Sequence, residues 1–506
     1  MNRLLNIAAV ATCLFAGTQL PGAAAEPDLP VKLTGIVMVE GMRLALFEMP
    51  VGQTRPHYIK PVLSEGERIE SLEVKRIEPE TGRVHVRHKG VETFYAVDEA
   101  ASQNAKRTLQ LNSADSRQVL DVFQQLTDRT ALMDPGLPGG KVTLDITAQT
   151  RQEAATAIEA AFRKLGIELQ PQAKKFTFVL QTNTLDRLAR IPAPPDDPAP
   201  TTKNPASGPG DDTIPAGMIK FQDADISQFL EIYQELTGCT VLRKDRPQAT
   251  KITIKTRTEL SRAQVIWAFE SILRLSDLAV APKGSKFICI ADAKDQGRLD
   301  TLPKVPAAAE SDDQFPAGMF KFWGADLSQV LEIYQSVTKR TVLQETGPGA
   351  RILAKNQTSL SRGEAVWMLD TLLALADLAA VPQGEKFVYV VRGASQPKLP
   401  TFSPNPIPED HASKSPLPAG GLKFSNAESR TLLETYAALC GRKALEPVPA
   451  SRVKLHNASE LTHAEALYAL EATAALNNLK LELVGDRDVR LVAAAEYRRR
   501  TPGDAR

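Results

Sequence analysis

Apolar and polar positions along the chain repeat one pattern at intervals of about one hundred residues. A short alternating segment leads into a helix-like stretch; the copy that starts at Pro215 returns at Pro316 and, more loosely, at Pro418. The spacings of 101 and 102 residues exceed those of solenoid repeats, so each copy is predicted to be a small domain with its own core. A fourth, more divergent copy begins near Leu109.

Each copy contains two predicted helices. The first carries one apolar stripe at i, i+3 and i+4, which predicts packing onto a sheet. Its tyrosines are therefore expected to be core residues. The second opens with a hydroxyl residue followed three positions later by Glu or Gln, the pattern of a capping box. These pairs are Thr150 with Glu153, Ser261 with Gln264, Ser361 with Glu364, and Thr462 with Glu465.

Strands flank both helices in every copy. Alternating segments such as 251–255 precede the second helix, and a closing strand such as 286–290 follows it. This order predicts a β-α-β-β-α-β module in which two helices cover one face of one sheet. Residues 31–97 instead show only strand patterns separated by turn signals. We therefore expect an α+β multidomain protein, with a small all-β barrel or sandwich before four modules.

Proline clusters separate the predicted modules. Such segments favour extended, semi-rigid conformations, so beads on a string are the expected geometry unless the domain faces bind one another. The fragment 210–295 is expected to fold alone. The predicted boundaries are 1–25 for a signal peptide, 30–98 for the β domain, 106–182 for repeat 1, 183–214 for a Pro-rich linker, 215–293 for repeat 2, 294–315 for a linker, 316–393 for repeat 3, 394–417 for a Pro-rich linker and 418–495 for repeat 4.

The N-terminus has the features of a secretory signal peptide. A basic residue precedes a short apolar run, and small residues precede Glu26, so cleavage near Ala25-Glu26 and a periplasmic location are expected. The apolar run is shorter than the roughly 20 residues that a membrane helix needs, so no transmembrane segment is expected in the mature chain. Lipid attachment at Cys13 is an alternative, although Thr12 is a poor residue before such a cysteine.

Charge and composition exclude several classes of function. With 61 basic and 60 acidic residues, the chain has no electrostatic basis for binding nucleic acid. The six histidines are scattered and no nucleophile or acid-base pair stands out, so neither an enzyme nor a cofactor or metal site is expected. Cys239 and Cys289 lie in one repeat and either form a disulfide or are small core residues.

The repeats resemble the N-terminal periplasmic, ring-building domains of secretins. The likeness rests on Phe-x-x-Ala-Asp before the first helix, Leu-Thr-Gly238 at its end, Leu-Ser before the second helix and Leu-Ala-Val-Ala-Pro-Lys-Gly before the closing strand. It is weaker in repeat 4, where Glu428 replaces the aspartate, and in repeat 1, which lacks the Pro-Ala-Gly lead-in. Residues 30–98 resemble the homology-region domain of type II secretion and type IV pilus proteins.

These resemblances imply a non-enzymatic periplasmic scaffold or accessory component of a type II secretion or type IV pilus-like system. A secretin continues into a β-rich channel domain, which is not expected here, so this chain is not expected to be the pore. Its expected partners are a secretin or other components of the apparatus. An exported protein that binds the cell wall is the alternative, because small sheets with two helices also occur in peptidoglycan-binding modules.

Two interaction surfaces are predicted. Trp267, Trp367 and Tyr468 share one position in the second helix, about 200° from the centre of its apolar stripe at 100° per residue, so we expect them to face a neighbouring repeat, another subunit or a partner. The alternative is that each residue folds onto the rim of its own domain or under a linker. The β domain is expected to dock by strand addition onto repeat 1 or onto a secretin, because that family pairing is implied by the resemblance.

Overall fold

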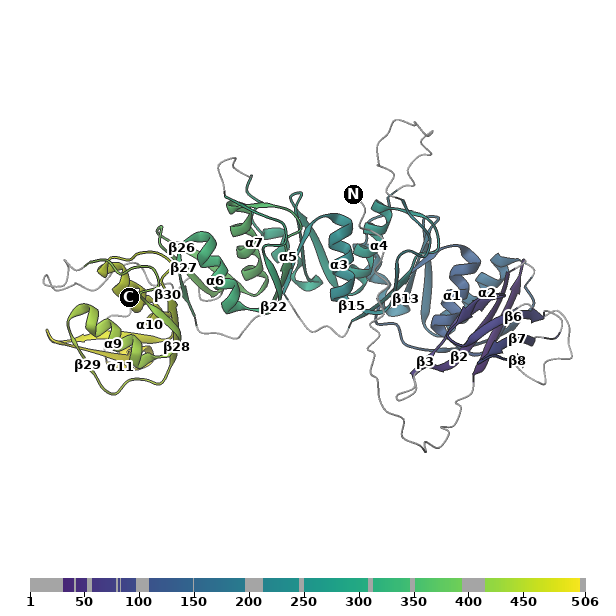
Figure 1. Ribbon diagram of the computed structural model, residues 1–506, viewed down its shortest axis with the longest axis horizontal. Coiled ribbons are helices and arrows are strands. Elements are labelled where there is room, and N and C mark those ends of the chain that lie inside the picture. Colours follow the sequence, from purple (N-terminus) through teal and green to yellow (C-terminus); the bar gives the residue numbers. More distant parts are fainter. Residues whose placement is uncertain are drawn as a thin grey trace. The chain divides into compact units, whose positions relative to one another are not determined.

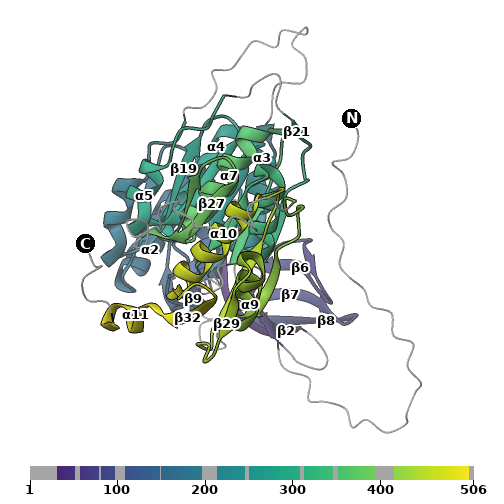
Figure 2. The same cartoon turned by 90° about the vertical axis from the view of Figure 1, so that its left-hand side faces the viewer.

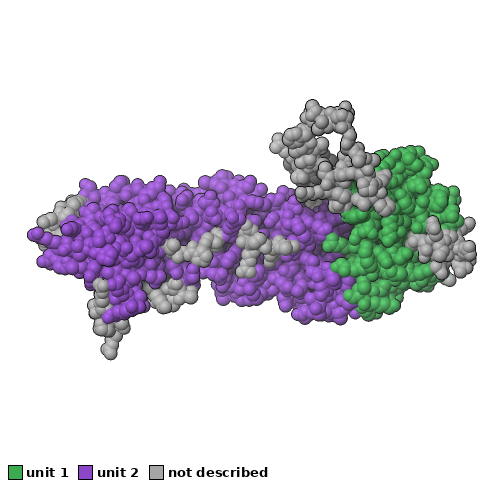
Figure 3. Space-filling view, turned by 90° about the horizontal axis from the view of Figure 1, so that it is seen from below, with its two compact units in different colours: residues 1–127, 139–165 green, residues 128–138, 166–506 purple. Residues whose placement is uncertain are grey.

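The computed structural model describes residues 31–40, 42–51, 57–78, 81, 83–96, 109–148, 150–195, 213–244, 250–307, 313–345, 351–393 and 415–500. The chain divides into two compact units (Figure 3), the first comprising Met1–Thr127 and Gly139–Leu165 and the second Asp128–Pro138 and Gly166–Arg506. Within the described ranges, no helix is long and apolar enough to cross a membrane. The predicted signal peptide and Cys13 lie outside these ranges.

The first unit begins with the β domain (Figure 1). Its strands are β1 (Lys32–Val39), β2 (Met42–Val51), β3 (His57–Ile59), β4 (Val62–Ser64), β5 (Arg68–Ile69), β6 (Leu72–Glu78), β7 (Arg83–His88) and β8 (Val91–Ala96). Strands β5-β6-β7-β8 form one sheet, while β1 to β4 belong to another. Apolar residues of both sheets, including Phe47, Val74 and Val86, form one buried cluster. This arrangement is compatible with the predicted sandwich.

Four elements of repeat 1 complete the first unit: β9 (Leu109–Asp115), α1 (Ser116–Thr127), β11 (Lys141–Ile146) and α2 (Arg151–Lys164). The sheet order is β11-β9-β1-β2-β3, with β4 paired to β2. The β domain and repeat 1 thus contribute strands to the same sheet.

The second unit contains the remaining strands of repeat 1 and repeats 2 to 4 (Figure 1; Figure 2). Repeat 1 supplies β10 (Thr130–Met133), β12 (Ile167–Gln172) and β13 (Phe176–Gln181), followed by the 3-10 helix η2 (Thr182–Arg190). Repeat 2 contains β14 (Thr213–Ile214), β15 (Lys220–Asp225), α3 (Ile226–Thr237), β16 (Thr240–Lys244), β17 (Lys251–Lys255), β18 (Leu260–Ser261), α4 (Arg262–Leu275), β19 (Leu278–Lys283) and β20 (Phe287–Asp292).

The later repeats follow the same order. After η3 (Ala293–Asp295) and α5 (Gln296–Thr301), repeat 3 contains β21 (Gln314–Phe315), β22 (Lys321–Asp326), α6 (Leu327–Thr338), β23 (Thr341–Gln344), β24 (Arg351–Lys355), β25 (Leu360–Ser361), α7 (Arg362–Leu375), β26 (Leu378–Gln383) and β27 (Phe387–Arg392). Repeat 4 contains β28 (Lys423–Glu428), α9 (Ser429–Cys440), β29 (Lys443–Leu445), β30 (Arg452–His456), α10 (His463–Leu476), β31 (Leu479–Val484), β32 (Asp488–Ala493) and α11 (Ala494–Arg500).

Local sequence signals set the ends of the helices. All four predicted capping boxes at the second helices are confirmed, with the hydroxyl side chain accepting from the N3 backbone and the N3 side chain accepting from the N-cap backbone. The predicted stripe of the first helix is buried, and Tyr233, Tyr334 and Tyr436 are at most 1% exposed. These tyrosines are core residues, as expected.

The strands of a repeat do not form one sheet, so the predicted layering is wrong. In repeat 2, β15 pairs with β17, whereas β16, β19 and β20 belong to a different sheet. That second sheet continues into repeat 3, in the order β19-β20-β16-β24-β22. The sheet β26-β27-β23-β30-β28 joins repeats 3 and 4 in the same way. Strand edges left over by one repeat are thus paired by the next, which satisfies their backbone groups.

The expectation of separate cores is also wrong. One buried cluster combines Leu132 and Phe178 of repeat 1 with Phe229 and other residues of repeat 2. A second combines Leu242 and Phe287 of repeat 2 with repeat 3, and a third combines residues of repeats 3 and 4. Successive repeats in the second unit therefore pack against one another through shared cores and are not separate domains joined by extended linkers.

The linker segments are described only in part. Residues 196–212, 308–312 and 394–414 lie outside the described ranges. The described parts contain η2 and α5 where extended chain was expected. Leu299 of α5 is fully buried and belongs to the core that repeats 2 and 3 share. Apolar residues in the first two linkers, such as Leu188 and Leu299, pack against the cores of the repeats and explain why parts of these two segments are folded.

Candidate protein-protein interface

The predicted aromatic residues lie where one repeat of the second unit meets the next. Trp267 on α4 and Trp367 on α7 are each 5% exposed, and Tyr468 on α10 is 2% exposed. Each packs on the first residue of the preceding repeat's closing strand. The ring centroids are 4.9 Å apart for Phe176 and Trp267, 4.9 Å for Phe287 and Trp367, and 5.1 Å for Phe387 and Tyr468. Each aromatic therefore contacts a neighbouring repeat, and the two tryptophans also lie under a predicted linker, because their indole nitrogens bond to Pro192 and Pro303.

The polar ends of these aromatic side chains are also paired. Trp267 Nε1 donates to the carbonyl oxygen of Pro192 at 2.9 Å, and Trp367 Nε1 donates to that of Pro303 at 3.0 Å. The hydroxyl of Tyr468 is hydrogen-bonded to that of Tyr389. Buried Trp and Tyr need such partners, and here the partner comes from the preceding repeat or from the segment that follows its closing strand.

A lysine just before each closing strand contacts the next repeat's capping box. Lys286 Nζ lies 2.8 Å from Glu364 Oε2 and 3.0 Å from the carbonyl oxygen of Ser359. The same pair of contacts joins Lys386 to Glu465 and Glu460, and joins Lys175 to Gln264 and Glu259, at 2.8 to 3.2 Å. The N3 side chain of the capping box thus fixes the helix start and also binds the neighbouring repeat.

A buried threonine forms a third recurrent contact. It begins the short strand after the first helix, and its hydroxyl accepts a hydrogen bond from a backbone N–H of the next repeat. The pairs are Thr130 with Arg257 at 3.1 Å, Thr240 with Gln357 at 3.1 Å and Thr341 with Ala458 at 3.2 Å. At the last two junctions, antiparallel pairing of β16 with β24 and of β23 with β30 adds backbone contacts.

We call this threonine, the lysine and the aromatic residues of the closing strand the closing face of a repeat. The second helix, from its capping box to the Trp or Tyr, is the helix face of the next repeat. The three junctions between repeats 1 and 2, 2 and 3, and 3 and 4 use the same positions on both faces.

Ion pairs surround the first two junctions. Arg187 of η2 lies 2.7 Å from Asp277, at the end of α4, and 3.1 Å from Asp134. Asp377 has the corresponding place in repeat 3 and is paired with Arg298 and Lys244. Partial burial works against ionisation of Asp377, but the hydrogen bond and the positive charge of Arg298 hold its pKa below the usual range. The charge of this aspartate is therefore stabilised by the preceding repeat.

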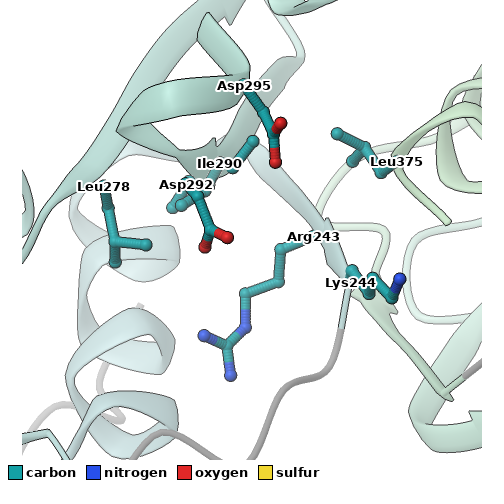
Figure 4. A pocket seen from close by; sticks show the side chains of 8 residues that line it. Arg243, Lys244, Leu278, Ile290, Asp292, Asp295 and Leu375 are labelled. Atoms are coloured by element: carbon teal, nitrogen blue, oxygen red, sulfur yellow. The ribbon is translucent and has the colours of Figure 1, made fainter. Parts of the chain in front are cut away.

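A small pocket lies at the junction of repeats 2 and 3 (Figure 4). Its volume is about 30 Å³, room for little more than a water molecule. Two cationic and two acidic side chains line it together with apolar residues: Arg243, Lys244, Leu278, Ile290, Ala291, Asp292, Asp295 and Leu375. Within the described residues there is no group of three His, Cys, Asp or Glu that could hold a metal ion.

The cysteines of repeat 2 are free thiols rather than a disulfide. Cys289 is fully buried in the core shared with repeat 3, and burial raises the pKa of its thiol to about 12. Cys239 is half-buried, and its thiol contacts the carbonyl oxygen of Ser285 at 3.5 Å. Of the two alternatives, a disulfide or small packing residues, the structure shows the second.

A different junction joins the β domain to repeat 1 in the first unit. Strand β1 pairs antiparallel with β9, with Gly35 opposite Leu111 and Val37 opposite Leu109. A Cβ atom on Gly35 would lie 2.7 Å from Leu111 Cδ2 and 3.0 Å from the carbonyl oxygen of Gln110, so a larger residue would force the ladder to shift. The strand addition predicted for this domain is present within the chain; binding of the domain to another protein stays a prediction.

Side chains around this ladder satisfy buried backbone groups. Gln118 of α1 is buried, and its Nε2 donates to the carbonyl oxygen of Phe47 at 2.6 Å. Lys60 Nζ lies 2.7 Å from Asp115 Oδ2, at the end of β9. Repeat 1 therefore contributes strand β9, which pairs with β1, and two polar side chains to the β domain.

Sequence reasoning found the aromatic residues of the helix face but missed the closing face. Lys175-Phe176, Lys286-Phe287 and Lys386-Phe387 open the closing strand in three copies, and a threonine opens the short strand in the same three. That internal repetition of a charged and an aromatic residue was the available signal. A strand that begins with Lys-Phe has no obvious partner until its neighbour in space is known.

Comparison with known proteins identifies one segment. Residues 219–290 match the family described as GspD-like, N0 domain, which covers repeat 2 from just before β15 into β20. No curated protein matches the chain. A solved structure described as "Structure of XcpQN012" is 13% identical, and the match covers 52% of this chain and 95% of that one, with a TM-score of 0.14. The family match supports the resemblance of repeat 2 to a secretin N-domain.

Proposed function

We propose that this protein is a non-enzymatic periplasmic scaffold or accessory component of a type II secretion or type IV pilus-like system. The observation that carries the proposal is the match of residues 219–290 to a GspD-like N0 domain. Repeats 1, 3 and 4 are proposed to be further secretin-like modules, because they share capping boxes and strand order with repeat 2. The β domain is proposed to be of the homology-region type.

The contacts between modules support a role in assembly. The recurrent side chains of this chain form contacts between repeats, and the aromatic, lysine and threonine positions all serve that purpose. The small pocket of mixed charge favours no reaction. We propose that the stacked repeats hold the chain as a spacer whose partners are a secretin or other components of the apparatus.

The test is to delete the gene in a strain with an active secretion or pilus system and to measure the exported proteins and pili. A tagged chain, cross-linked in whole cells, is expected to capture the secretin or another component of that apparatus. N-terminal sequencing of the captured chain is expected to begin near Glu26. Normal secretion and pili, together with binding to purified sacculi and no cross-link to the apparatus, would instead establish the cell-wall function.

A further inference from the structure

Repeat 4 has no closing face of the kind found in the other repeats. Equivalent positions in repeats 3 and 4 are identified by one backbone hydrogen bond, which joins the start of the short strand after the first helix to the residue before the closing strand. Lys443 N donates to the carbonyl oxygen of Arg487 at 2.8 Å, as Thr341 N does to Lys386 at 2.7 Å. Lys443 therefore stands where the junction threonine is expected, and Arg487 stands in place of the junction lysine.

The aromatic positions of that face are charged in repeat 4. Asp488 follows Arg487 where Phe387 follows Lys386. Two residues further along the closing strand, Arg490 lies opposite Glu482, whereas Tyr389 lies opposite Val381 in repeat 3. Arg490 Nε and Glu482 Oε2 are 2.7 Å apart. An apolar pair that covers the next repeat is thus replaced by an ion pair.

Repeat 1 shows the complementary change on its helix face. The position of Trp267, six residues after the N-cap, is Thr156 on α2. Thr156 is exposed, as are Glu153, Ala160 and Lys164 on the same face. The equivalent residues of α4 are all buried: Gln264, Trp267, Ser271 and Leu275. The helix face of repeat 1 is therefore polar and lacks the aromatic residue that a closing face contacts.

We infer that the closing face of repeat 4 and the helix face of repeat 1 do not form repeat junctions. Neither a fifth repeat nor a second copy of this chain stacks on repeat 4 or on α2 in this way. Burying Lys443, Asp488 and the Arg490 pair under an apolar helix face would desolvate charges without supplying partners. Polar outer faces of this kind terminate repeat arrays and keep them soluble. The junction contacts are consequently used within the chain.

The inference is tested with a longer chain in which residues 394–506 are repeated after Arg506. The added copy carries Tyr468→Trp, which supplies the aromatic residue found in repeats 2 and 3 and distinguishes by mass, in amide hydrogen exchange, the peptides that contain position 468. The native repeat 4 in the same chain is the reference, because its Ala458 N–H is bonded to Thr341. We expect peptides around residues 456–470 of the added copy to exchange at least tenfold faster than the native ones.

A second chain restores the closing face of the native repeat 4 with Lys443→Thr, Glu482→Val, Arg487→Lys, Asp488→Phe and Arg490→Tyr, all residues of repeat 3. Protection of the added copy is expected to rise at least tenfold. Exchange at the junction of repeats 3 and 4 reports whether the variant is folded. Equal protection of the native and added copies in the chain with the unaltered closing face overturns the inference. A folded variant with the restored closing face in which protection of the added copy does not rise also overturns it. Neither result bears on the secretion assay above.

Discussion

The junction of the β domain with repeat 1 and the junctions between repeats hold neighbouring modules by different means. The first is a backbone ladder between β1 and β9, in which Gly35 allows close approach and Gln118 satisfies a carbonyl group. The junctions between repeats depend on an aromatic side chain that is under 10% exposed, a lysine and a threonine. Strand pairing contributes at most two residue pairs to each of these junctions. Backbone pairing tolerates many side chains, whereas a side-chain junction specifies which repeats stack.

The largest effect is expected from Trp367→Ala. The indole fills the core shared by repeats 2 and 3 and donates to Pro303, so its removal is expected to cost about 3 to 5 kcal/mol of unfolding free energy. Chemical denaturation of the whole chain measures this. The matched control is Trp323→Ala in the same repeat, because Trp323 is 52% exposed and should cost only about 0.5 kcal/mol. Equal losses would mean that Trp367 is not part of the junction.

How much of this was predictable depends on where the signal lies. Helix periodicity placed Trp267 off the apolar stripe, and the capping boxes fixed the start of α4, because both are local patterns. The sharing of sheets was not predictable, because β16 and β24 pair through backbone groups that leave no mark on side-chain alternation. The folded part of the linker 294–315 was likewise not predicted, because α5 is short and is held by few side chains, chiefly the buried Leu299 and the ion pair of Arg298 with Asp377.

Asp370 of α7 lies within one repeat, so its pH dependence can be compared with that of the charged groups at the junctions. Burial raises the pKa of Asp370 to about 6, although Tyr334 and Arg340 act to lower it. Since the folded pKa lies above the unfolded value, ionisation destabilises the fold above pH 6, and the penalty disappears as the pH falls towards 4. Asp370→Asn is therefore expected to add about 1 to 3 kcal/mol at pH 7.5 and nothing at pH 4.

The control for Asp370→Asn is Glu434→Gln on the exposed face of α9, which should change unfolding by little at either pH. Thermal melts at the two pH values are sufficient. A stabilisation that is the same at pH 4 and pH 7.5 would show that the ionisation of Asp370 is not its cause.

The N-terminal junction is tested by Gln118→Ala. Removing the amide leaves the buried carbonyl oxygen of Phe47 without the 2.6 Å hydrogen bond from Gln118, at an expected cost of about 1 to 3 kcal/mol. Amide exchange of β1 and β9 should accelerate, while exchange in repeats 3 and 4 stays unchanged. Gln152→Ala, at an exposed position of α2, is the matched control. Faster exchange throughout the chain would contradict a local role.

The lysine contact is expected to contribute less. Lys286→Met keeps the aliphatic stem but removes the ammonium group from Glu364, whose side chain is only 7% exposed. We expect a loss of about 1 to 2 kcal/mol, because the carboxylate stays largely buried without its charged partner. The same change at Lys386 should cost less, since Glu465 is 22% exposed. Urea denaturation of both variants measures the two losses. A loss at Lys386 that equals or exceeds the loss at Lys286 would contradict the role given to burial of the carboxylate.

The smallest effect concerns the sign of the pH dependence at a junction. Desolvation of Glu465 opposes ionisation, but its hydrogen bonds to Lys386 and to the Thr462 backbone lower the pKa below 4.5. The folded pKa is thus depressed, so this group stabilises the junction above pH 4.5 and the contribution is lost as the pH falls through the folded value. Because the pair is partly exposed, about 0.5 kcal/mol is expected. Glu465→Gln should remove that acid-dependent loss, the opposite of the change at Asp370, and 1 M salt should weaken the contact in the native chain as well. If Glu465→Gln left the acid limb of the stability curve unchanged, the lysine and the capping box would be neighbours that contribute no charge interaction to the junction.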